Sequence, residues 1–170
     1  KLLWAFSPGA KAPNPIPTNE HHFTVNSPNS WAPAAYDAKL DLVYLPMGVT
    51  TPDIWGGNRT PEQERYASSI VALNATTGKL AWSYQTVHHD LWDMDMPSQP
   101  TLADITLNGE TLPVIYAPAK TGNIFVLDRR NGKLVVPAPA RPVPQGAATG
   151  DYGSKTQPFP ALSLRPKKGL

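Results

Sequence analysis

The sequence predicts an all-β fold built from repeated four-stranded antiparallel units. The 20 prolines among 170 residues are unfavourable inside helices and central strands, so they divide the chain into short elements with many turns. Short β-prone runs flank Asp or Asn-Gly turns, and this plan occurs twice along the chain. Hydrophobic residues make up 41% and charged residues 16%, a globular composition rather than that of a disordered chain.

The first unit is predicted over residues 31–86 and consists of two hairpins. Asn74 ends a strand by bonding the turn backbone, and Gly78 supplies the positive φ that closes the second turn. Its four runs are Trp31–Asp37, Leu42–Leu45, Ile70–Asn74 and Lys79–Tyr84. Between the hairpins, Pro61–Ala67 is a possible short helix that Thr60 caps, with Gln63 counted one residue short of the capping-box spacing.

The second unit is predicted over residues 91–137 and follows the same plan. Asn108–Gly109 forms the turn of its first hairpin, and Gly132 takes the place that Gly78 has in the first unit. Its four runs are Ser98–Asp104, Val114–Ala117, Ile124–Asp128 and Lys133–Val136.

The rest of the chain is predicted to connect such units. Residues 7–30 and 138–170 are long connections, and Lys1–Trp4 matches Lys79–Trp82 as the last strand of an earlier copy. Repeated four-stranded units indicate a β-propeller, with a Greek-key sandwich as the alternative. Because two blades cannot close a ring, we expect the chain to be an internal fragment of one propeller domain.

Charge and composition exclude several kinds of function. The net charge of +2 is small, and the Arg165–Lys168 cluster is interpreted as a solvated surface, so we expect no nucleic-acid partner. The absence of cysteine excludes disulfides, thiolate metal sites and cysteine catalysis. No apolar run approaches the roughly 20 residues that cross a bilayer. The sequence also has no Gly-rich phosphate loop, which argues against a nucleotide-dependent enzyme.

Three segments carry a family resemblance. Residues 72–82, ALNATTGKLAW, resemble the tryptophan-docking motif of quinoprotein dehydrogenases, in which a Trp packs near the turn glycine of the next blade. Residues 87–97, VHHDLWDMDMP, resemble their active-site loop, and residues 117–123, APAKTGN, resemble the strand that brings a cation to pyrroloquinoline quinone (PQQ). The whole chain is similar to membrane-bound PQQ-dependent glucose dehydrogenases. Val136 departs from the docking motif because it stands where a Trp is expected.

The resemblance implies roles for four residues. Asp93 would be the catalytic base and would lie against a divalent cation, Ca²⁺ or Mg²⁺. Lys120 would bond the quinone oxygens of PQQ and stabilise the negative charge of the reduced cofactor. Trp31 would stack on the PQQ ring. Thr51 falls where alcohol-oxidising relatives place an Asn metal ligand, although a hydroxyl is a poorer ligand than an amide carbonyl.

Other polar residues receive a more modest interpretation. Asp95 is interpreted as a structural group that bonds nearby backbone, not as a metal ligand. His21–His22 and His88–His89 are adjacent pairs whose side chains point opposite ways on an extended chain, so neither pair alone makes a metal site. We expect His88 and His89 to orient the loop that carries Asp93.

The resemblance implies oxidation of D-glucose to glucono-1,5-lactone, with PQQ as acceptor and electrons passed to ubiquinone. It also implies about eight blades in the full ring, a membrane anchor before this segment, and a periplasmic catalytic domain. Two alternatives stay open: a relative that oxidises another polyol, such as quinate or glycerol, and a non-catalytic propeller that binds protein partners.

Overall fold

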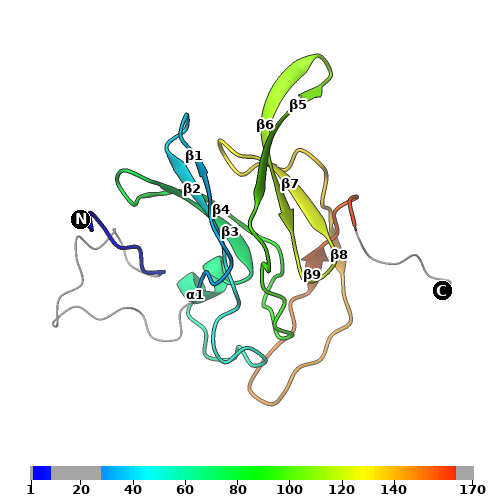
Figure 1. Ribbon diagram of the computed structural model, residues 1–170. Coiled ribbons are helices and arrows are strands. Elements are labelled where there is room, and N and C mark those ends of the chain that lie inside the picture. The colour runs from blue at the N-terminus through cyan, green and yellow to red at the C-terminus, as the bar shows by residue number, and fades with distance from the viewer. Residues whose placement is uncertain (1, 9–27, 164–170) are drawn as a thin grey trace.

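A computed structural model describes residues 2–8 and 28–163 of the chain. Within these residues the regular secondary structure is antiparallel sheet together with one short helix, and long loops join the strands (Figure 1). Several sequence features lie outside the described residues: Lys1, His21–His22, most of the 7–30 connection and the Arg165–Lys168 cluster. No helix in the described ranges has the length and apolarity that crossing a membrane requires.

The first predicted unit is confirmed as a four-stranded sheet in the order β1-β2-β3-β4. Asp37 shapes its first turn, because its Oδ1 accepts hydrogen bonds from the backbone N–H groups of Lys39 and Leu40. The register shifts between Ala72 and Leu73 where β3 pairs with β4. The strands are β1 (Ala35–Asp37), β2 (Leu42–Pro46), β3 (Ser69–Asn74) and β4 (Leu80–Gln85).

The second unit forms a three-stranded sheet in the order β5-β6-β7. Asn108 and Gly109 both have positive φ and close the β5–β6 hairpin as predicted. The strands are β5 (Thr101–Leu107), β6 (Glu110–Pro118) and β7 (Ile124–Asp128). The expected fourth strand is wrong in extent. It is reduced to one bridge between Leu127 and Leu134, because Pro137 follows closely and has no N–H with which to extend a ladder.

The expected connection over residues 138–170 contains structure that the sequence did not indicate. Strands β8 (Ala140–Pro142) and β9 (Thr156–Pro158) form a small two-stranded sheet. This sheet is tied to the chain before the second unit. Gln157 accepts a hydrogen bond from the His88 N–H at 2.7 Å and donates one to the His88 carbonyl at 2.6 Å.

The helix α1 (Pro61–Tyr66) lies between the two hairpins of the first unit. Thr60 caps it, and the capping box with Gln63 is complete, so the expectation of an incorrect spacing is wrong. The spacing counts from the cap residue, and Gln63 is the third residue after Thr60. The helix ends one residue earlier than predicted, because Ala67 already has an extended backbone.

The two large sheets pack face to face and share one core. The largest fully buried side chains of this core include Tyr44 and Ile70 from the first sheet and Ile115 and Phe125 from the second. Met96, from the loop between the sheets, is fully buried in the same cluster. Stacked sheets with a common apolar core are the expected arrangement of neighbouring blades.

Two tryptophans dock on the turns of neighbouring units as the motif predicts. Trp4 Nε1 donates to the Ala75 carbonyl at 2.9 Å, and a Cβ on Gly78 would lie 2.5 Å from the Trp4 ring. Trp82 Nε1 donates to the Arg129 carbonyl at 3.1 Å, and a Cβ on Gly132 would lie 2.6 Å from the Trp82 ring. Glycine is therefore required at both turns for two reasons, the positive φ and the contact with the indole.

Candidate functional site

The loops that carry the predicted site residues gather at one end of the sheets, opposite the tip of the β5–β6 hairpin (Figure 1). Asp93 lies on the loop between β4 and β5, and Lys120 lies in the tight turn between β6 and β7. That turn is closed by hydrogen bonds from Ala119 N–H to the Asn123 carbonyl and from Gly122 N–H to the Ala119 carbonyl. The site is thus supported by a short rigid turn on one side and a longer loop on the other.

Asp93 and Lys120 meet in space. Lys120 Nζ lies 3.1 Å from Asp93 Oδ2 and 3.0 Å from the Asp93 carbonyl oxygen. The Asp93 side chain is 48% exposed and that of Lys120 is 32% exposed, so a ligand from solvent can reach both groups. Burial lowers the pKa of Lys120, but its bonds to Asp95 and Asp93 outweigh this and leave the pKa above 10.5. The ammonium is therefore a fixed positive charge beside the Asp93 carboxylate.

Asp95 joins three parts of the site. Its Oδ1 accepts a 2.6 Å hydrogen bond from Val49 N–H, and its Oδ2 accepts bonds of 3.0 Å from both Trp31 Nε1 and Lys120 Nζ. Burial raises the pKa of Asp95, but the bonds from Val49, Lys120 and Trp31 more than offset it, so the pKa lies below 3.8. Asp95 does bond backbone, but its partner is Val49, 46 residues away, and not nearby backbone as predicted; its contacts with Trp31 and Lys120 were missed.

Trp31 presents an exposed ring beside the charged pair. The residue is 57% exposed although its indole nitrogen is held by Asp95. Lys120 Nζ lies 6.0 Å from the centroid of the Trp31 ring. A flat aromatic surface next to an ammonium and a carboxylate is suited to a planar ligand that carries carbonyl or carboxylate oxygens.

Thr51 is not brought to the charged pair. Its side chain is exposed, and within residues 28–163 no hydrogen bond or ion pair joins it to Asp93 or Lys120. Its neighbour Thr50 is buried and donates its hydroxyl to the Gln63 carbonyl at 3.2 Å. In the described ranges no group of three or more His, Cys, Asp or Glu side chains is placed to hold a metal ion.

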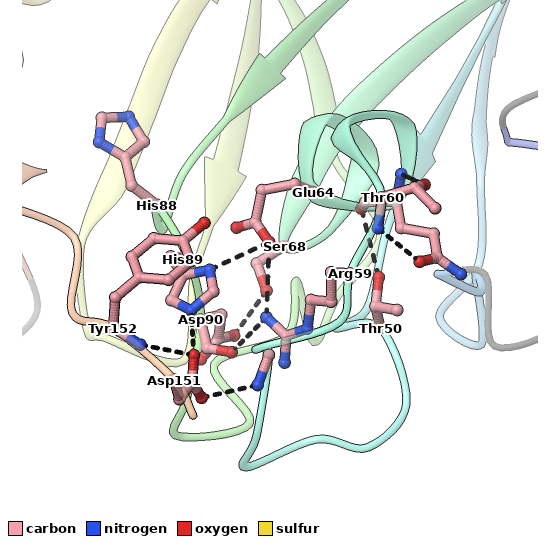
Figure 2. A network of polar contacts seen from close by, with 12 residues as sticks. Thr50, Arg59, Thr60, Glu64, Ser68, His88, His89, Asp90, Asp151 and Tyr152 are labelled. Carbon is pink, nitrogen blue, oxygen red and sulfur yellow. Dashed lines mark hydrogen bonds and ion pairs between the residues drawn. The ribbon is translucent and has the colours of Figure 1, made fainter. Parts of the chain in front are cut away.

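The adjacent histidines face different partners, as predicted. His88 Nδ1 lies 3.1 Å from the Thr156 carbonyl oxygen, on the side of β9. His89 is buried, and its two ring nitrogens face Asp151 Oδ1 at 2.8 Å and Glu64 Oε2 at 3.1 Å. Both histidines thus tie the Asp93 loop to other segments, and Figure 2 shows the part of this network around His89.

A known protein family matches the whole chain. The PQQ family model described as "Glucose/ethanol/alcohol dehydrogenase, beta-propeller domain" matches residues 1–170. The chain belongs to this family. As a PQQ-family propeller it has the blade architecture that the docking turns predict, and the Greek-key alternative is wrong.

Relatives within the PQQ family match the whole chain. It is 84% identical over 170 residues to "Quinoprotein glucose dehydrogenase" of Escherichia coli (strain K12). This alignment covers 100% of the chain and 21% of that relative. It is 63% identical over 172 residues to the protein of the same name from Gluconobacter oxydans (strain 621H), again covering 100% of this chain and 21% of the relative. The chain thus spans about a fifth of the length of these curated relatives.

A solved structure supports the PQQ-family fold. The quinohemoprotein alcohol dehydrogenase from Comamonas testosteroni superposes with a TM-score of 0.58 and is 33% identical. The similarity covers 79% of this chain and 20% of that chain.

Proposed function

We propose that the intact protein oxidises D-glucose to glucono-1,5-lactone with PQQ as its cofactor, and that Asp93 is the base in this reaction. The observation that supports the proposal most directly is the pairing of Asp93 with Lys120 beside the exposed ring of Trp31. The identity to glucose dehydrogenases over the full chain supports the choice of substrate class.

Two of the described residues offer groups that PQQ requires. PQQ is a planar orthoquinone with three carboxylates, so it needs an aromatic surface and nearby cations. Trp31 offers an exposed ring, and Lys120 offers an ammonium whose direction two carboxylates hold. When bound, PQQ supplies the electron-accepting carbonyl, and the protein supplies position and electrostatics.

Asp93 is placed to take a proton from a sugar hydroxyl. Its side chain is 48% exposed and bonds the Lys120 ammonium through Oδ2 alone, so Oδ1 stays available to a substrate. Lys120 stays protonated beside it and stabilises negative charge that develops next to the base. General-base assistance of this kind contributes about 10²–10⁴ in rate.

We extend the proposal to a divalent cation, Ca²⁺ or Mg²⁺, with Asp93 as one ligand. Such ions take six or more oxygen ligands. Asp93 offers an exposed carboxylate, while one oxygen of Asp95 is already held by Val49 N–H. Thr51 as a second ligand stays a prediction that no contact in the described ranges supports. Other oxygens would have to complete the coordination.

The wider assignments extend the family resemblance to the whole protein. We propose that the sheets at residues 31–86 and 91–137 are consecutive blades of one PQQ-binding propeller domain. We also propose that electrons pass to ubiquinone and that the catalytic domain is periplasmic in a membrane-anchored protein.

The test uses the intact protein prepared without cofactor. PQQ is added with Ca²⁺ or Mg²⁺, and glucose-dependent reduction of an artificial electron acceptor is followed. We expect turnover that requires PQQ, metal and glucose together, and Asp93→Asn should lower kcat about 10²–10⁴-fold while PQQ still binds. If the protein binds PQQ and oxidises quinate or glycerol but not glucose, then glucose is the wrong substrate and the other polyol takes its place in the proposal. Failure to bind PQQ would favour a non-catalytic propeller.

A further inference from the structure

The backbone of Asp93 is held in an unusual conformation. Its φ is +55°, in the left-handed region that residues other than Gly, Asn and Asp rarely adopt. This conformation is strained for most L-residues, so neighbouring contacts are needed to hold it in place. The direction of the Asp93 carboxylate toward Lys120 depends on this turn.

Asp90 supplies those contacts. Its side chain is fully buried, and its Oδ1 accepts a 2.9 Å hydrogen bond from the N–H of Trp92. Its Oδ2 accepts a 2.7 Å bond from the N–H of Met94. The two bonded amides lie immediately before and after Asp93 in the chain. The carboxylate of Asp90 therefore bridges the turn that carries Asp93.

The Asp90 carboxylate is itself anchored to the first sheet. Ser68, the residue before β3, donates its hydroxyl to Asp90 Oδ2 at 2.6 Å. The guanidinium of Arg59 donates to the backbone carbonyl of Asp90 at 2.7 Å. Figure 2 shows these groups converging on the loop from separate segments.

The preceding residue adds a second anchor. The buried His89 ring lies between Glu64 and Asp151 and stacks on Tyr152, with ring centroids 3.7 Å apart (Figure 2). His89 also has positive φ, +44°, so the chain turns sharply on entering the Asp90 segment. Two consecutive residues thus fix the loop before it reaches Asp93.

We propose that Asp90 is the positioning residue for Asp93, acting through the Trp92 and Met94 amides to aim the Asp93 carboxylate at Lys120. The inference rests on the proposed function, because that function makes Asp93 the base. In this role Asp90 acts through the backbone and does not contact substrate or cofactor.

A carboxylate suits this task better than an amide. Three donors converge on Asp90: the N–H groups of Trp92 and Met94 and the hydroxyl of Ser68. Asn in its place would offer one acceptor oxygen and would turn an NH₂ donor toward at least one of these N–H groups. One of the two amides beside Asp93 would then lose its partner.

The first test measures amide hydrogen exchange in the intact protein without PQQ. In Asp90→Asn we expect exchange of at least one of the Trp92 and Met94 amides to rise about tenfold, as loss of one hydrogen bond predicts. Asp128→Asn is the matched control: Asp128 is a buried turn carboxylate that bonds the Arg130 N–H, and the equivalent residue of the first unit is already Asn74. It should leave exchange at residues 92–94 unchanged.

The second test separates positioning from general damage. With PQQ and metal bound, Asp90→Asn should lower kcat about 10- to 100-fold, because a small misplacement of a catalytic group is costly. KM for glucose should stay within about threefold. Combined with Asp93→Asn, the Asp90→Asn change should add no further loss, since both act on one function. An additive loss in the double variant would overturn the positioning role.

A milder variant keeps the inference testable if Asp90→Asn fails to fold. Ser68→Gly removes the hydroxyl that holds Asp90 Oδ2 and tolerates the positive φ of this position, +44°. It should raise exchange at Met94 above the wild-type rate. Unchanged exchange in both variants would overturn the inference even in an active enzyme. Raised exchange in a protein that never oxidises glucose would instead overturn the proposed function and leave the turn as described.

Discussion

Trp82 of the first sheet lies directly against Gly132 of the second, and its Nε1 donates to the carbonyl of Arg129 at 3.1 Å. The hydroxyl of Tyr44 donates to the same carbonyl at 2.9 Å. One turn of the second unit therefore receives two aromatic side chains from the first. This contact ties the two sheets together beside their shared apolar core.

Gly132→Ala should destabilise the intact protein more than Gly109→Ala does. Both glycines have positive φ, +72° and +82°. A Cβ at Gly132 would lie 2.6 Å from the Trp82 ring, whereas a Cβ at Gly109 meets nothing within 4 Å. We expect the free energy of unfolding to fall by about 1–3 kcal/mol more for Gly132→Ala, as overpacking predicts. Urea unfolding measures both, and equal losses would contradict the close contact.

Trp82→Phe and Tyr44→Phe should be coupled. Each substitution removes one donor to the Arg129 carbonyl and leaves the other in place. The double variant leaves this buried acceptor without either aromatic donor, which costs about 1–3 kcal/mol beyond the sum of the single losses. A double-mutant cycle on unfolding free energies measures the coupling, and strict additivity would show that the carbonyl has another donor.

Acid should release the ion pair between Asp37 and Arg129, whose closest atoms lie 2.6 Å apart. Burial raises the pKa of Asp37, but the bonds from Arg129, Leu40 and Lys39 outweigh it and hold the pKa below 3.8. The stability that Asp37 contributes is thus present above pH 3.8 and is lost as the pH falls through the lower folded value.

Asp37→Asn checks this pH dependence. It should lower the free energy of unfolding by about 1.5–3 kcal/mol at pH 7, the usual value of a hydrogen bond to a charged group. The difference from wild type should shrink as the pH falls below 3.8, because the unfolded state then binds a proton that the folded Asp37 carboxylate takes up only at lower pH. A difference that stays constant down to pH 2.5 would argue against the ion pair as the cause.

Asp95→Asn should weaken PQQ binding. Asp95 holds both the Trp31 indole and the Lys120 ammonium, and an amide oxygen is a weaker acceptor for each. We expect an affinity about tenfold lower, equivalent to about 1.4 kcal/mol. Quenching of tryptophan fluorescence during PQQ titration measures it, with Asp128→Asn as the control. An unchanged affinity would place the cofactor away from Trp31 and Lys120.

Local patterns in the sequence predicted the sheets and the docking turns well. Asn108–Gly109 and Gly132 belong to short turn motifs that can be recognised from consecutive residues. The docking residue Trp82 follows Gly78 in the sequence within one such motif, residues 72–82. The β8–β9 sheet was missed because three-residue strands that include Pro142 and Pro158 carry no alternating pattern. Such strands form only because other segments hold them.

The site was predictable where the resemblance covered it and not where distant contacts decide it. Asp93 and Lys120 do meet, 27 residues apart in sequence. Asp95 appeared to be an ordinary loop residue because its partners Trp31 and Val49 lie 64 and 46 residues away. The Asp90 turn, by contrast, has a local signal in the sequence. An Asp side chain commonly accepts a hydrogen bond from the backbone N–H two residues later, as Asp90 does from Trp92.

The anchors of the Asp93 loop have a consequence for the order of assembly. His89 is held by Glu64 from the first unit and by Asp151 from the chain that follows the second. A nascent chain that has completed only its first sheet therefore lacks the Asp151 anchor of the loop. Asp93, the proposed base, therefore gains the full set of anchors of its loop only after the segment carrying Asp151 and Gln157 has folded back, late in the folding of the chain.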